Sequence, residues 1–518
     1  MAYYPYETEK LVDFTIESNI KKFEEGIKTV RSYLGKTYPL LVDGKKIETD
    51  NLLKSFNPSN HSEVIGMIHQ AGKFEVDLAI ESALRNFETW KLTDYKMRAD
   101  ILFKSASIIR KRKFEFSSLL ALEAGKPWAE ADADTAEAID FLEYYARSIY
   151  DVMEKDKHIL SRKDIERNEY VYKPLGVCAV ITPWNFPLAI LAGMTTAAVV
   201  TGNTVLLKPA VTTQVIAYKF MEVLKEAGLP DGIVQFIPGD AIEVGEYIVT
   251  HPKVRFVSFT GSKAVGVRIY EKAAVVQPGQ KWLKRVIAEM GGKDAMIIDE
   301  DCDLDFAASE VAKAAFSFAG QKCSAASRAI VHEKVYDSFI EKLVNITKTY
   351  KVGAAELKDT FVGPVNDDNA FNKITSYIEI GKKEGKLVFG GTNDKSKGYF
   401  IEPTIIKDLK KDSRIMQEEI FGPVLGITKF KTFDEALEIA NSTEYGLTGS
   451  VISNNRENLE KARKHFEVGN LYLNRKCTGA IVGYQPFGGF NMSGTDSKAG
   501  GPDYLILHMQ AKTISEMF

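Results

Sequence analysis

VCAVITP at residues 177–183 begins a series of short apolar runs that continues with TVLLKP at 204–209, IVQFIPG at 233–239 and VRFVSFTGS at 254–262. β-Branched and other apolar residues fill each run, and a segment long enough for a helix separates each run from the next. Strands that alternate with helices predict a parallel sheet with crossover helices. The middle of the chain is therefore expected to form an open α/β sheet.

A second series of this kind follows residue 289. Its strand candidates are AMIID at 295–299, ASRAIVH at 326–332, SVISN at 450–454 and NLYLN at 470–474. The predicted fold class is α/β, with two lobes that each contain a parallel sheet. Residues 1–158 and 178–288 are assigned to the first lobe and residues 289–488 to the second.

The N-terminal part of the first lobe is expected to be mainly helical. Apolar residues recur at helical spacing over 8–34, 74–92, 96–124 and 129–155. Between the first two patterns, YPLLVDGKKIET at 38–49 predicts a hairpin, because Asp43-Gly44 is a strong turn signal.

Two further segments, 159–177 and 489–518, are predicted to form an oligomerisation arm and tail. The stretch from His158 to Lys173 is charged and alternating, like an exposed hairpin. The final AKTISEMF has strand character and would leave an unprotected edge in a monomer.

Composition narrows the function. The 518 residues have a net charge of −3, which gives no reason to expect nucleic acid or an anionic membrane as a partner. Four cysteines lie far apart and seven histidines are scattered, so no metal site is predicted. The N-terminus lacks a secretory pattern and no apolar run is long enough to span a membrane. A cytoplasmic location is expected.

Three strand ends carry residues suited to a dinucleotide. They are the turn Thr182-Pro183-Trp184-Asn185, the cation Lys208, and Gly261-Ser262 with Gly266. Ligands of open α/β sheets bind at carboxyl ends of strands, and glycines before a helix let backbone N–H groups approach a pyrophosphate. Each feature also has a plain structural explanation, an N-cap or a solvated lysine. The G-x-G-x-x-G pattern of ordinary Rossmann dehydrogenases is missing.

A thiol and a carboxylate are the candidate catalytic pair. Cys323 lies in the polar turn Gly320-Gln321-Lys322, where a cation could favour the thiolate. Glu289 ends an apolar strand, where burial would raise its pKa toward that of a general base. The alternatives are a small buried cysteine and a solvated acid, and Cys178 and Cys302 are assigned to the first of these.

Seven motifs in order, TPWNFP, LLKPA, FTGS, EMGGK, GQKCSA, EEIFGPV and PFGG, resemble the aldehyde dehydrogenase superfamily over essentially the whole chain. The resemblance implies a Rossmann-like cofactor lobe, a catalytic lobe and a β-arm. Within this superfamily, the sequence more closely resembles one branch, the 1-pyrroline-5-carboxylate dehydrogenases, which oxidise glutamate γ-semialdehyde. The segments of this chain that resemble that branch are EAGKPWAEADADTAEAIDFLEYYAR, NRKCTGAIVGYQPFGG and the tail from MSGTDSKAGG to the C-terminus.

The resemblance implies a role for each candidate. Cys323 would form a thiohemiacetal and then a thioester with the aldehyde, Asn185 and the Cys323 N–H would hold the oxyanion, and Glu289 would activate water. NAD would be bound by Thr182, Pro183, Trp184, Lys208, Gly261, Ser262, Gly266, Glu419 and Phe421. Val211 occupies a position where many NAD-preferring relatives have Glu, so use of NADP stays possible.

The resemblance also implies contacts to an amino-acid aldehyde. Glu137 would bind the ammonium, unless it is one more solvated acid. Lys322 would support anionic substrate or thiolate, or serve the structure. The carboxylate would be bound by Ser324, Gly479 and Ala480, and the aromatic walls would be Phe186 and Phe487. Some relatives have Ser where Ala480 stands, so only the main chain could serve there.

Three alternatives to glutamate γ-semialdehyde oxidation stay open. Another semialdehyde, such as succinate semialdehyde, could be the substrate of the same chemistry. A non-catalytic, crystallin-like scaffold could retain the fold. A cysteine hydrolase is conceivable, although no histidine motif suggests a partner for Cys323. In the resembling family the arm and tail pair across subunits, so a homo-oligomer, at least a dimer, is expected.

Overall fold

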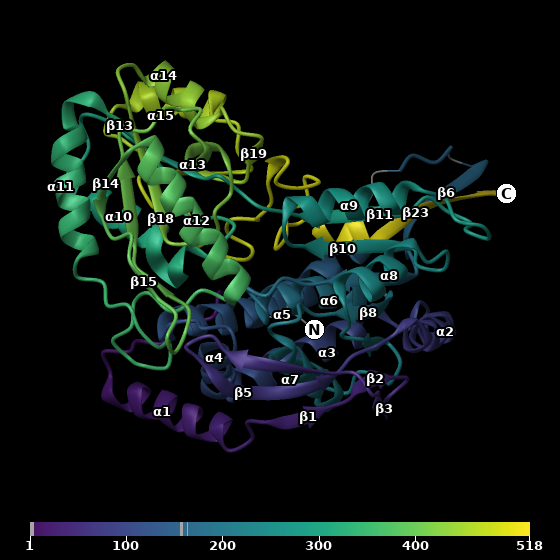
Figure 1. Ribbon diagram of the computed structural model, residues 1–518. Helices are drawn as coiled ribbons and strands as arrows, with labels where there is room; N and C mark the ends of the chain where they lie inside the picture. Colours follow the sequence, from purple (N-terminus) through teal and green to yellow (C-terminus); the bar gives the residue numbers. More distant parts are fainter. Residues whose placement is uncertain (1–4, 156–158, 163) are drawn as a thin grey trace.

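The computed structural model describes residues 5–155, 159–162 and 164–518. The four apolar runs at 177–262 form neighbouring strands of one seven-stranded sheet, ordered β11-β10-β7-β8-β9-β2-β3 (Figure 1). Five of its strands are parallel: β7 (Val177–Ile181), β8 (Thr204–Lys208), β9 (Val234–Phe236), β10 (Phe256–Thr260) and β11 (Arg285–Glu289). The predicted hairpin, β2 (Leu40–Val42) and β3 (Lys45–Ile47), completes the edge in antiparallel pairing.

Crossover helices connect these strands. They are α6 (Ala189–Val200), α7 (Gln214–Glu226), η1 (Ala241–Glu246) with α8 (Tyr247–Thr250), and α9 (Lys263–Ala274). Helix α6 is buried almost all round, which explains why its sequence has no polar face. The predicted α/β alternation is confirmed in this sheet.

The N-terminal segment packs against the first sheet. It contains α1 (Glu17–Arg31), α2 (Lys73–Trp90), α3 (Tyr95–Lys111), α4 (Lys113–Glu123), α5 (Trp128–Glu154) and a three-stranded sheet of β1 (Lys36–Tyr38), β4 (Leu52–Asn57) and β5 (Asn60–His69). The expectation of helix from residue 8 is wrong, because Glu9 and Val12 instead donate backbone hydrogen bonds to Asp140 and Asp132 of α5. The pattern over 96–124 is two helices, because the backbone leaves helical geometry at Arg112.

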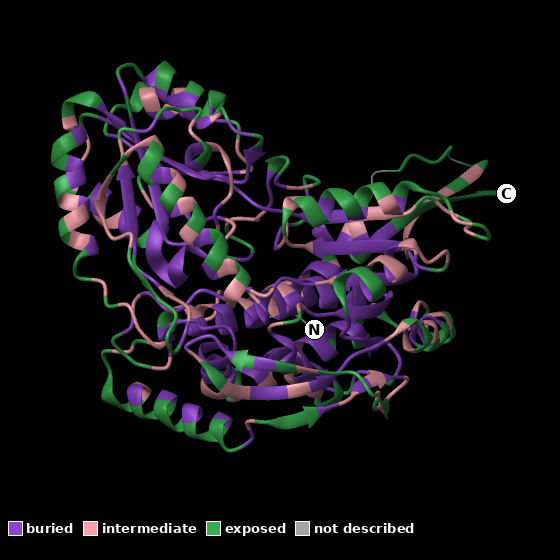
Figure 2. Ribbon diagram, viewed as in Figure 1, coloured by how far each residue is buried: buried purple, intermediate pink, exposed green. Residues whose placement is uncertain are grey.

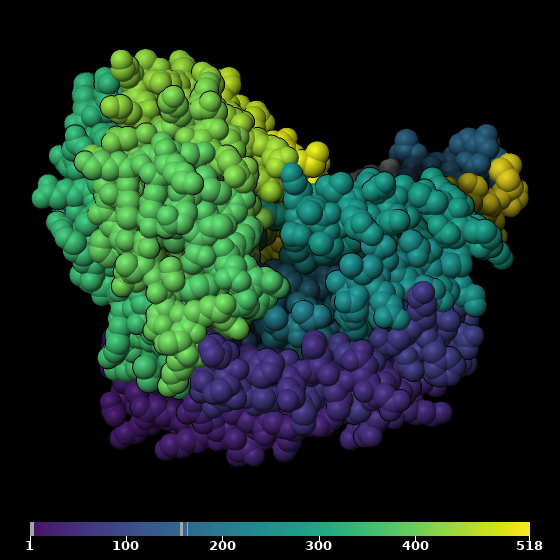
Figure 3. Space-filling model, in the orientation of Figure 1, coloured from purple at the N-terminus to yellow at the C-terminus, as the bar shows by residue number. Residues whose placement is uncertain are grey.

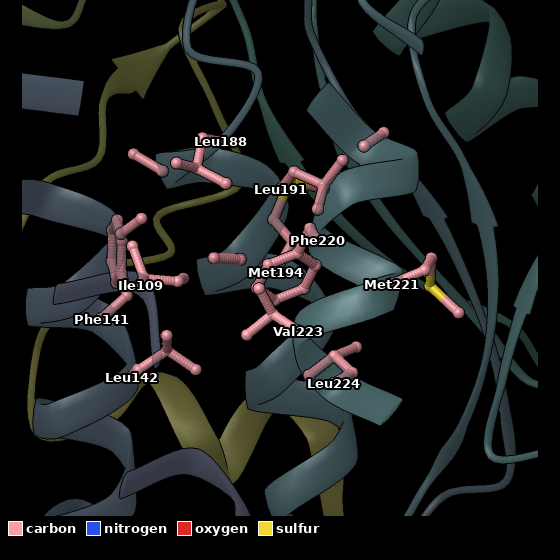
Figure 4. Packing of buried hydrophobic residues seen from close by; sticks show 14 of the residues in the cluster. Ile109, Phe141, Leu142, Leu188, Leu191, Met194, Phe220, Met221, Val223 and Leu224 are labelled. Atoms are coloured by element: carbon pink, nitrogen blue, oxygen red, sulfur yellow. The ribbon is translucent and has the colours of Figure 1, made fainter. Parts of the chain in front are cut away.

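The main hydrophobic core lies among α3, α5, α6 and α7. Figure 4 shows Ile109, Phe141, Leu191, Phe220 and Leu224 converging from these helices, and all five are buried. Each fully buried side chain of this size contributes roughly 1.5–3 kcal/mol by leaving water. The core therefore gives the strand ends a rigid support.

The second sheet, ordered β14-β17-β18-β13-β12-β20-β21, also has seven strands. All neighbours except β14 are parallel: β12 (Ala295–Ile298), β13 (Arg328–His332), β17 (Thr404–Lys407), β18 (Val424–Phe430), β20 (Thr448–Ile452) and β21 (Asn470–Leu473), with β14 (Lys386–Phe389) antiparallel at the edge. Its helices are α10 (Leu304–Phe316), α11 (Tyr336–Thr347), α12 (Asp368–Glu384), α13 (Arg414–Gln417), α14 (Phe433–Ala440) and α15 (Arg456–His465). Both predicted parallel sheets are thus present.

Two small pairs, β15 (Asn393–Asp394) with β16 (Phe400–Ile401) and β19 (Tyr445–Gly446) with β22 (Phe490–Asn491), complete this part of the chain. The central strands of both large sheets are buried, as Figure 2 shows in purple. In the space-filling view, a furrow separates the light-green surface of the second lobe from the teal surface of the first (Figure 3).

A two-stranded ribbon extends from the first lobe. Strand β6 (Glu166–Pro174) pairs antiparallel with β23 (Met509–Met517), so the predicted arm and tail lie together within one chain (Figure 1). Most of β23 is exposed. Of the predicted arm, His158 and Lys163 lie outside the described residues.

Candidate active site

Four strand ends of the first sheet lie in one row. The register pairs Lys208 with Ile181, Ile181 with Phe259, and Thr260 with Glu289. Strand β7 lies between β8, which follows it in the chain, and β10, which comes later, so the strand order reverses at β7. Such a reversal is where open α/β sheets bind ligands. The three predicted strand ends therefore meet at one edge, with Glu289 beside them.

Lys208 is buried at this edge, and its ammonium has no hydrogen bond or ion pair with the residues that the structure describes. Burial lowers the pKa of Lys208 to about 8, opposed by the charge of Asp240. The neighbouring Thr182 hydroxyl is also buried without a described partner. These unpaired polar groups argue against the explanation of Lys208 as a solvated surface charge.

Helix α9 begins at this same edge. Ser262 is its N-cap and its hydroxyl accepts a hydrogen bond from Val265 N, which is the plain explanation that the sequence left open. Gly261 donates its own N–H to the Glu289 carbonyl, 3.1 Å away. A Cβ at Gly266 would lie 2.5 Å from Met290 Sδ, and the Gly266 N–H is bonded to Ser262 O within the helix. Gly266 therefore allows α9 to pack closely on the sheet and offers no free donor to a ligand.

The turn after β7 crosses to the second lobe. Pro183 is buried, and the Trp184 ring meets the Phe421 ring edge-on, with centroids 5.5 Å apart. Phe421 has a positive φ of 59°. The Asn185 side-chain amide donates to Gln321 O, 3.0 Å away. Thus the predicted oxyanion donor lies against the loop that carries Cys323.

The loop before Cys323 has an unusual backbone. Phe318 and Ala319 have φ of 50° and 53° in η2 (Ser317–Gly320), and Gly320 has φ of 66°. A Cβ at Gly320 would lie 2.3 Å from Gly422 O, so only glycine fits there. The Gln321 side chain donates to Phe318 O and Pro364 O and accepts from Asn366 N, which holds the loop on three sides.

Cys323 is half-buried among carboxylates. Burial raises the pKa of its thiol, and the charges of Asp294, Glu419, Glu289 and Glu137 raise that pKa further. Three of the predicted site carboxylates, Glu289, Glu419 and Glu137, are therefore within electrostatic reach of the thiol. Both effects, burial and charge, favour the thiol over the thiolate.

Lys322 has polar partners of its own. Lys322 Nζ forms an ion pair with Glu130, 2.7 Å away, and donates to Ser317 Oγ. The Glu130 carboxylate offsets part of the charge of Lys322, and these contacts suit the structural role that the sequence left open. Support of the thiolate or of an anionic substrate by Lys322 stays a prediction.

Glu289 ends β11 with a buried side chain. Ser497 Oγ donates a short hydrogen bond to Glu289 Oε1, while Oε2 is buried without a partner among the described residues. Burial raises the pKa of Glu289 to about 8, and the Ser497 hydrogen bond and the charge of Lys498 oppose that rise. A carboxylate with a free oxygen and this pKa is suited to take a proton from water.

Glu419 follows α13 in the second lobe and contacts the segment after β11. Its carboxylate accepts a hydrogen bond from Gly292 N, 3.1 Å away, and a Cβ at Gly291 would lie 2.3 Å from it. Burial raises the pKa of Glu419. A small cavity here is lined by both predicted residues Glu419 and Phe421, with Gly292, Gly320 and Lys322 among the others.

Of the predicted substrate residues, Ser324 directly follows Cys323 and Glu137 is near enough to raise the pKa of its thiol. Glu137 on α5 makes no hydrogen bond or ion pair with a described residue, and burial raises its pKa to about 8. Ser324 is buried, and its carbonyl accepts from Cys477 Sγ. Gly479 and Ala480 have backbone N–H groups that are bonded to none of the described residues.

The two predicted aromatic walls differ in their contacts. The centroids of the Phe186 and Phe318 rings are 6.5 Å apart. Lys126 Nζ lies over the Phe186 ring, 3.7 Å from its centroid. Phe487 is half-buried and pairs with Ala499 in an isolated bridge. A separate cavity of about 430 Å³, lined by Ser59, Lys397 and Glu402 among others, contains none of the predicted residues.

A model of the aldehyde dehydrogenase family matches residues 45–514. The chain belongs to this family. The 1-pyrroline-5-carboxylate dehydrogenase of Anoxybacillus flavithermus is 62% identical over 514 residues, 99% of each chain, and that of Bacillus mycoides is 60% identical over 511. The Thermus 1-pyrroline-5-carboxylate dehydrogenase with bound NAD has a TM-score of 0.98 at 47% identity, over 100% of both chains.

Sequence reasoning missed a buried lysine of this aldehyde dehydrogenase. Lys126 Nζ pairs with Asp134 at 3.0 Å and donates to the Asn185 carbonyl at 2.7 Å, with both charged side chains fully buried. The same ammonium lies over the Phe186 and Phe318 rings. The sequence signal that could have identified Lys126 is a lysine within the apolar segment before α5.

No cluster of metal-binding side chains occurs among the described residues of this aldehyde dehydrogenase. In the same part of the chain, no helix is both long and apolar enough to cross a membrane. Cys178 is buried in β7 and Cys302 is half-buried in an acidic loop.

Proposed function

We propose that this aldehyde dehydrogenase oxidises L-glutamate γ-semialdehyde, the open form of 1-pyrroline-5-carboxylate, to L-glutamate, with NAD as the hydride acceptor. The observation that carries the proposal is the surroundings of Cys323. Within electrostatic reach of one thiol lie Glu289, which has a free oxygen, and Glu137, which has no partner among the described residues. The names of the relatives at 59–62% identity agree with this substrate.

The residues at the strand ends fit a dinucleotide. Lys208 offers an unpaired, buried ammonium, and the Thr182 hydroxyl is equally free. The Gly261 N–H is already bonded to the Glu289 carbonyl, so the start of α9 would offer phosphate chiefly the positive end of its helix dipole. Glu419 and Phe421 border the small cavity beside the Cys323 loop, which supports their assignment to the nicotinamide end of the dinucleotide. When bound, the oxidised nicotinamide supplies the hydride acceptor.

The protein groups then divide the reaction into two stages. The Cys323 thiol first releases its proton to solvent. The thiolate Sγ then bonds to the aldehyde carbon, and the carbonyl π electrons move to the oxygen, giving an oxyanion that accepts from the Asn185 amide and the Cys323 N–H. One such donor contributes about 3–4 kcal/mol to the transition state. After oxidation the substrate is a thioester of Cys323. Glu289 takes a proton from water, the oxygen attacks the thioester carbon, and the acid leaves as the sulfur is released.

The substrate residues account for an amino-acid aldehyde. Glu137 would receive the α-ammonium, because an unpaired buried carboxylate gains most from a cationic partner. The free N–H groups of Gly479 and Ala480 would receive the α-carboxylate, together with Ser324. Phe186 and Phe487 would enclose the methylene carbons.

We also propose a homo-oligomer, at least a dimer, in the cytoplasm. The exposed ribbon of β6 and β23 supports assembly, since its outer edges are open to pairing. All four cysteines are free, which suits a reducing compartment. Sedimentation of the native protein and cell fractionation test these two statements.

A steady-state assay tests the reaction itself. Reduction of NAD and of NADP is followed with glutamate γ-semialdehyde and with succinate semialdehyde. We expect the highest kcat/KM with glutamate γ-semialdehyde and NAD; NADP turnover would follow from Val211, which presents no acid to a 2′-phosphate. A preference for succinate semialdehyde would overturn the substrate, and no reduction with any aldehyde would favour a non-catalytic scaffold.

A further inference from the structure

The segment after β21 is folded around one guanidinium. The two hydrogens of Arg475 Nη2 are donated to Thr478 O, 3.0 Å away, and Gly479 O, 2.9 Å away. The guanidinium lies over the Tyr472 ring at 4.5 Å, and the Arg475 carbonyl accepts from Ser450 Oγ. The arginine is thus held at both ends and holds two successive carbonyls itself.

These two hydrogen bonds fix the direction of two N–H groups. Each peptide unit is planar and trans, so a carbonyl oxygen and the N–H of the next residue point to opposite sides. Because Arg475 holds the carbonyls of Thr478 and Gly479, the N–H groups of Gly479 and Ala480 both point away from the guanidinium. Neither N–H has a hydrogen-bond partner among the described residues.

The segment lies beside the nucleophile. Cys477 Sγ donates to Ser324 O at 3.4 Å, so the chain just before Thr478 contacts the residue that follows Cys323. Lys476 N is bonded to Glu310 on α10, the helix that leads to the Cys323 loop. Gly479 has a φ of 79°, a conformation that side chains other than glycine rarely adopt.

We propose that Arg475 is a positioning residue for substrate selection: it aligns the N–H groups of Gly479 and Ala480 into a carboxylate receptor and polarises both peptides. This inference rests on the proposed function, because it assigns the receptor to the α-carboxylate of the semialdehyde. A cation that binds a carbonyl makes the N–H of the same peptide a stronger donor, which favours an anionic acceptor on the far side.

Three aldehydes of equal chain length separate the contributions. Glutamate γ-semialdehyde has both the ammonium and the carboxylate, 5-oxopentanoate has the carboxylate only, and pentanal has neither. They are tested with Arg475→Met, which keeps the apolar stem, with Arg475→Lys, which restores a cation, and with Arg463→Met as a control on the exposed side of α15.

For Arg475→Met we expect KM to rise by about tenfold or more for both carboxylates, since each loses hydrogen bonds to a charged group. kcat for these substrates and kcat/KM for pentanal are expected to change less than about threefold, because the nucleophile is untouched. Arg475→Lys should recover part of the loss, and Arg463→Met should match the native enzyme. Turnover of pentanal also shows that each variant is folded.

Two results would overturn the inference. Equal losses with pentanal and the carboxylates would make Arg475 a general structural residue, and unchanged KM values would remove it from recognition. The proposed function fails differently: the native enzyme would then show no preference for glutamate γ-semialdehyde or 5-oxopentanoate over pentanal.

Discussion

The surroundings of Cys323 define what each residue of the site can do. Its thiol has carboxylates rather than cations as neighbours, and these raise its pKa. Cys302 also has a raised pKa, about 11, from burial and Asp301, but it lies in the acidic loop between β12 and α10 and was not predicted to take part in catalysis. We therefore expect Cys323→Ala to lower kcat by about three orders of magnitude or more and Cys302→Ala to leave it unchanged.

Fluorescence titration with NADH checks that Cys323→Ala still binds dinucleotide. In the companion variant Glu289→Gln, the amide cannot take the proton from water, so the thioester should accumulate and add the acyl mass to the intact protein. Normal turnover by Cys323→Ala would end the mechanistic proposal. A Glu289→Gln enzyme without the added mass would assign the hydrolytic proton to another group.

Ser497 lowers the pKa of Glu289, the proposed general base. Its hydroxyl donates to Glu289 Oε1 and so opposes the effect of burial, which sets the pKa of Glu289 at about 8. A general base is active when deprotonated, so hydrolysis should fall as the pH drops through this value. In Ser497→Ala the pKa of Glu289 should rise, and the acid limb of the hydrolysis rate should move to higher pH.

The measurement is single-turnover thioester decay between pH 6 and 10. Ser376→Ala, on the exposed face of α12, is the control. An acid limb that stays in place in Ser497→Ala would show that this hydrogen bond does not persist in the acyl-enzyme.

At the level of elements, the sequence predicted the strands of the first sheet, but in the second sheet it predicted β12, β13, β20 and β21 and missed β14, β17 and β18. Short β-branched runs bounded by glycine and proline are typical of buried strands, and their parallel order brings their ends together. This is why Lys208, Thr182 and Gly261 could be assigned to neighbouring strand ends from the sequence alone. Helix boundaries failed where tertiary contacts decided them, as at the segment before Glu17, whose backbone bonds to α5.

The supporting residues could not be predicted in the same way. Lys126 reaches Asn185 over 59 positions and Ser497 reaches Glu289 over 208. Such contacts have no local pattern, because they depend on how elements pack. Arg475 is close to Gly479 in sequence, but its role depends on the direction of two peptide planes, which composition does not encode. The roles of the site residues stay predictions.

Lys126 and Asp134 form a buried ion pair at the start of α5. Lys126 also donates to the Asn185 carbonyl, and Asp134 accepts from Ala189 N, so the pair connects α5 to the turn after β7. Removing one member of a buried pair leaves an uncompensated charge, so Lys126→Met should lower the free energy of unfolding by about 3–5 kcal/mol. The double variant Lys126→Met/Asp134→Asn should recover part of this, since asparagine carries no charge and can still accept from Ala189 N.

Urea denaturation measures these values. Lys21→Met removes the exposed pair with Glu17, and we expect a change of less than about 0.5 kcal/mol. A loss in Lys126→Met no larger than this control would mean that water reaches Asp134 and solvates its charge.

For the whole molecule, the ribbon of β6 and β23 is the feature that a single chain does not explain. Two strands alone are marginally stable in water, and this pair runs from Met509↔Pro174 to Met517↔Glu166 beyond the body of the first lobe. Ile514 on β23 is 39% exposed, and Phe518, directly after the strand, is 77% exposed. We therefore expect these apolar side chains on an open edge to contact another subunit.

Light scattering at micromolar concentration should therefore give at least the mass of a dimer for the native protein. Ile514→Lys/Phe518→Lys should lower that mass, because two charges would be buried in the contact without partners, whereas the equally drastic Leu92→Lys, at a side chain 77% exposed on the first lobe, should not. Circular dichroism should be unchanged in both variants, since none of these side chains is in a core. A native monomer, or a double variant of undiminished mass, would leave the ribbon without a role in assembly.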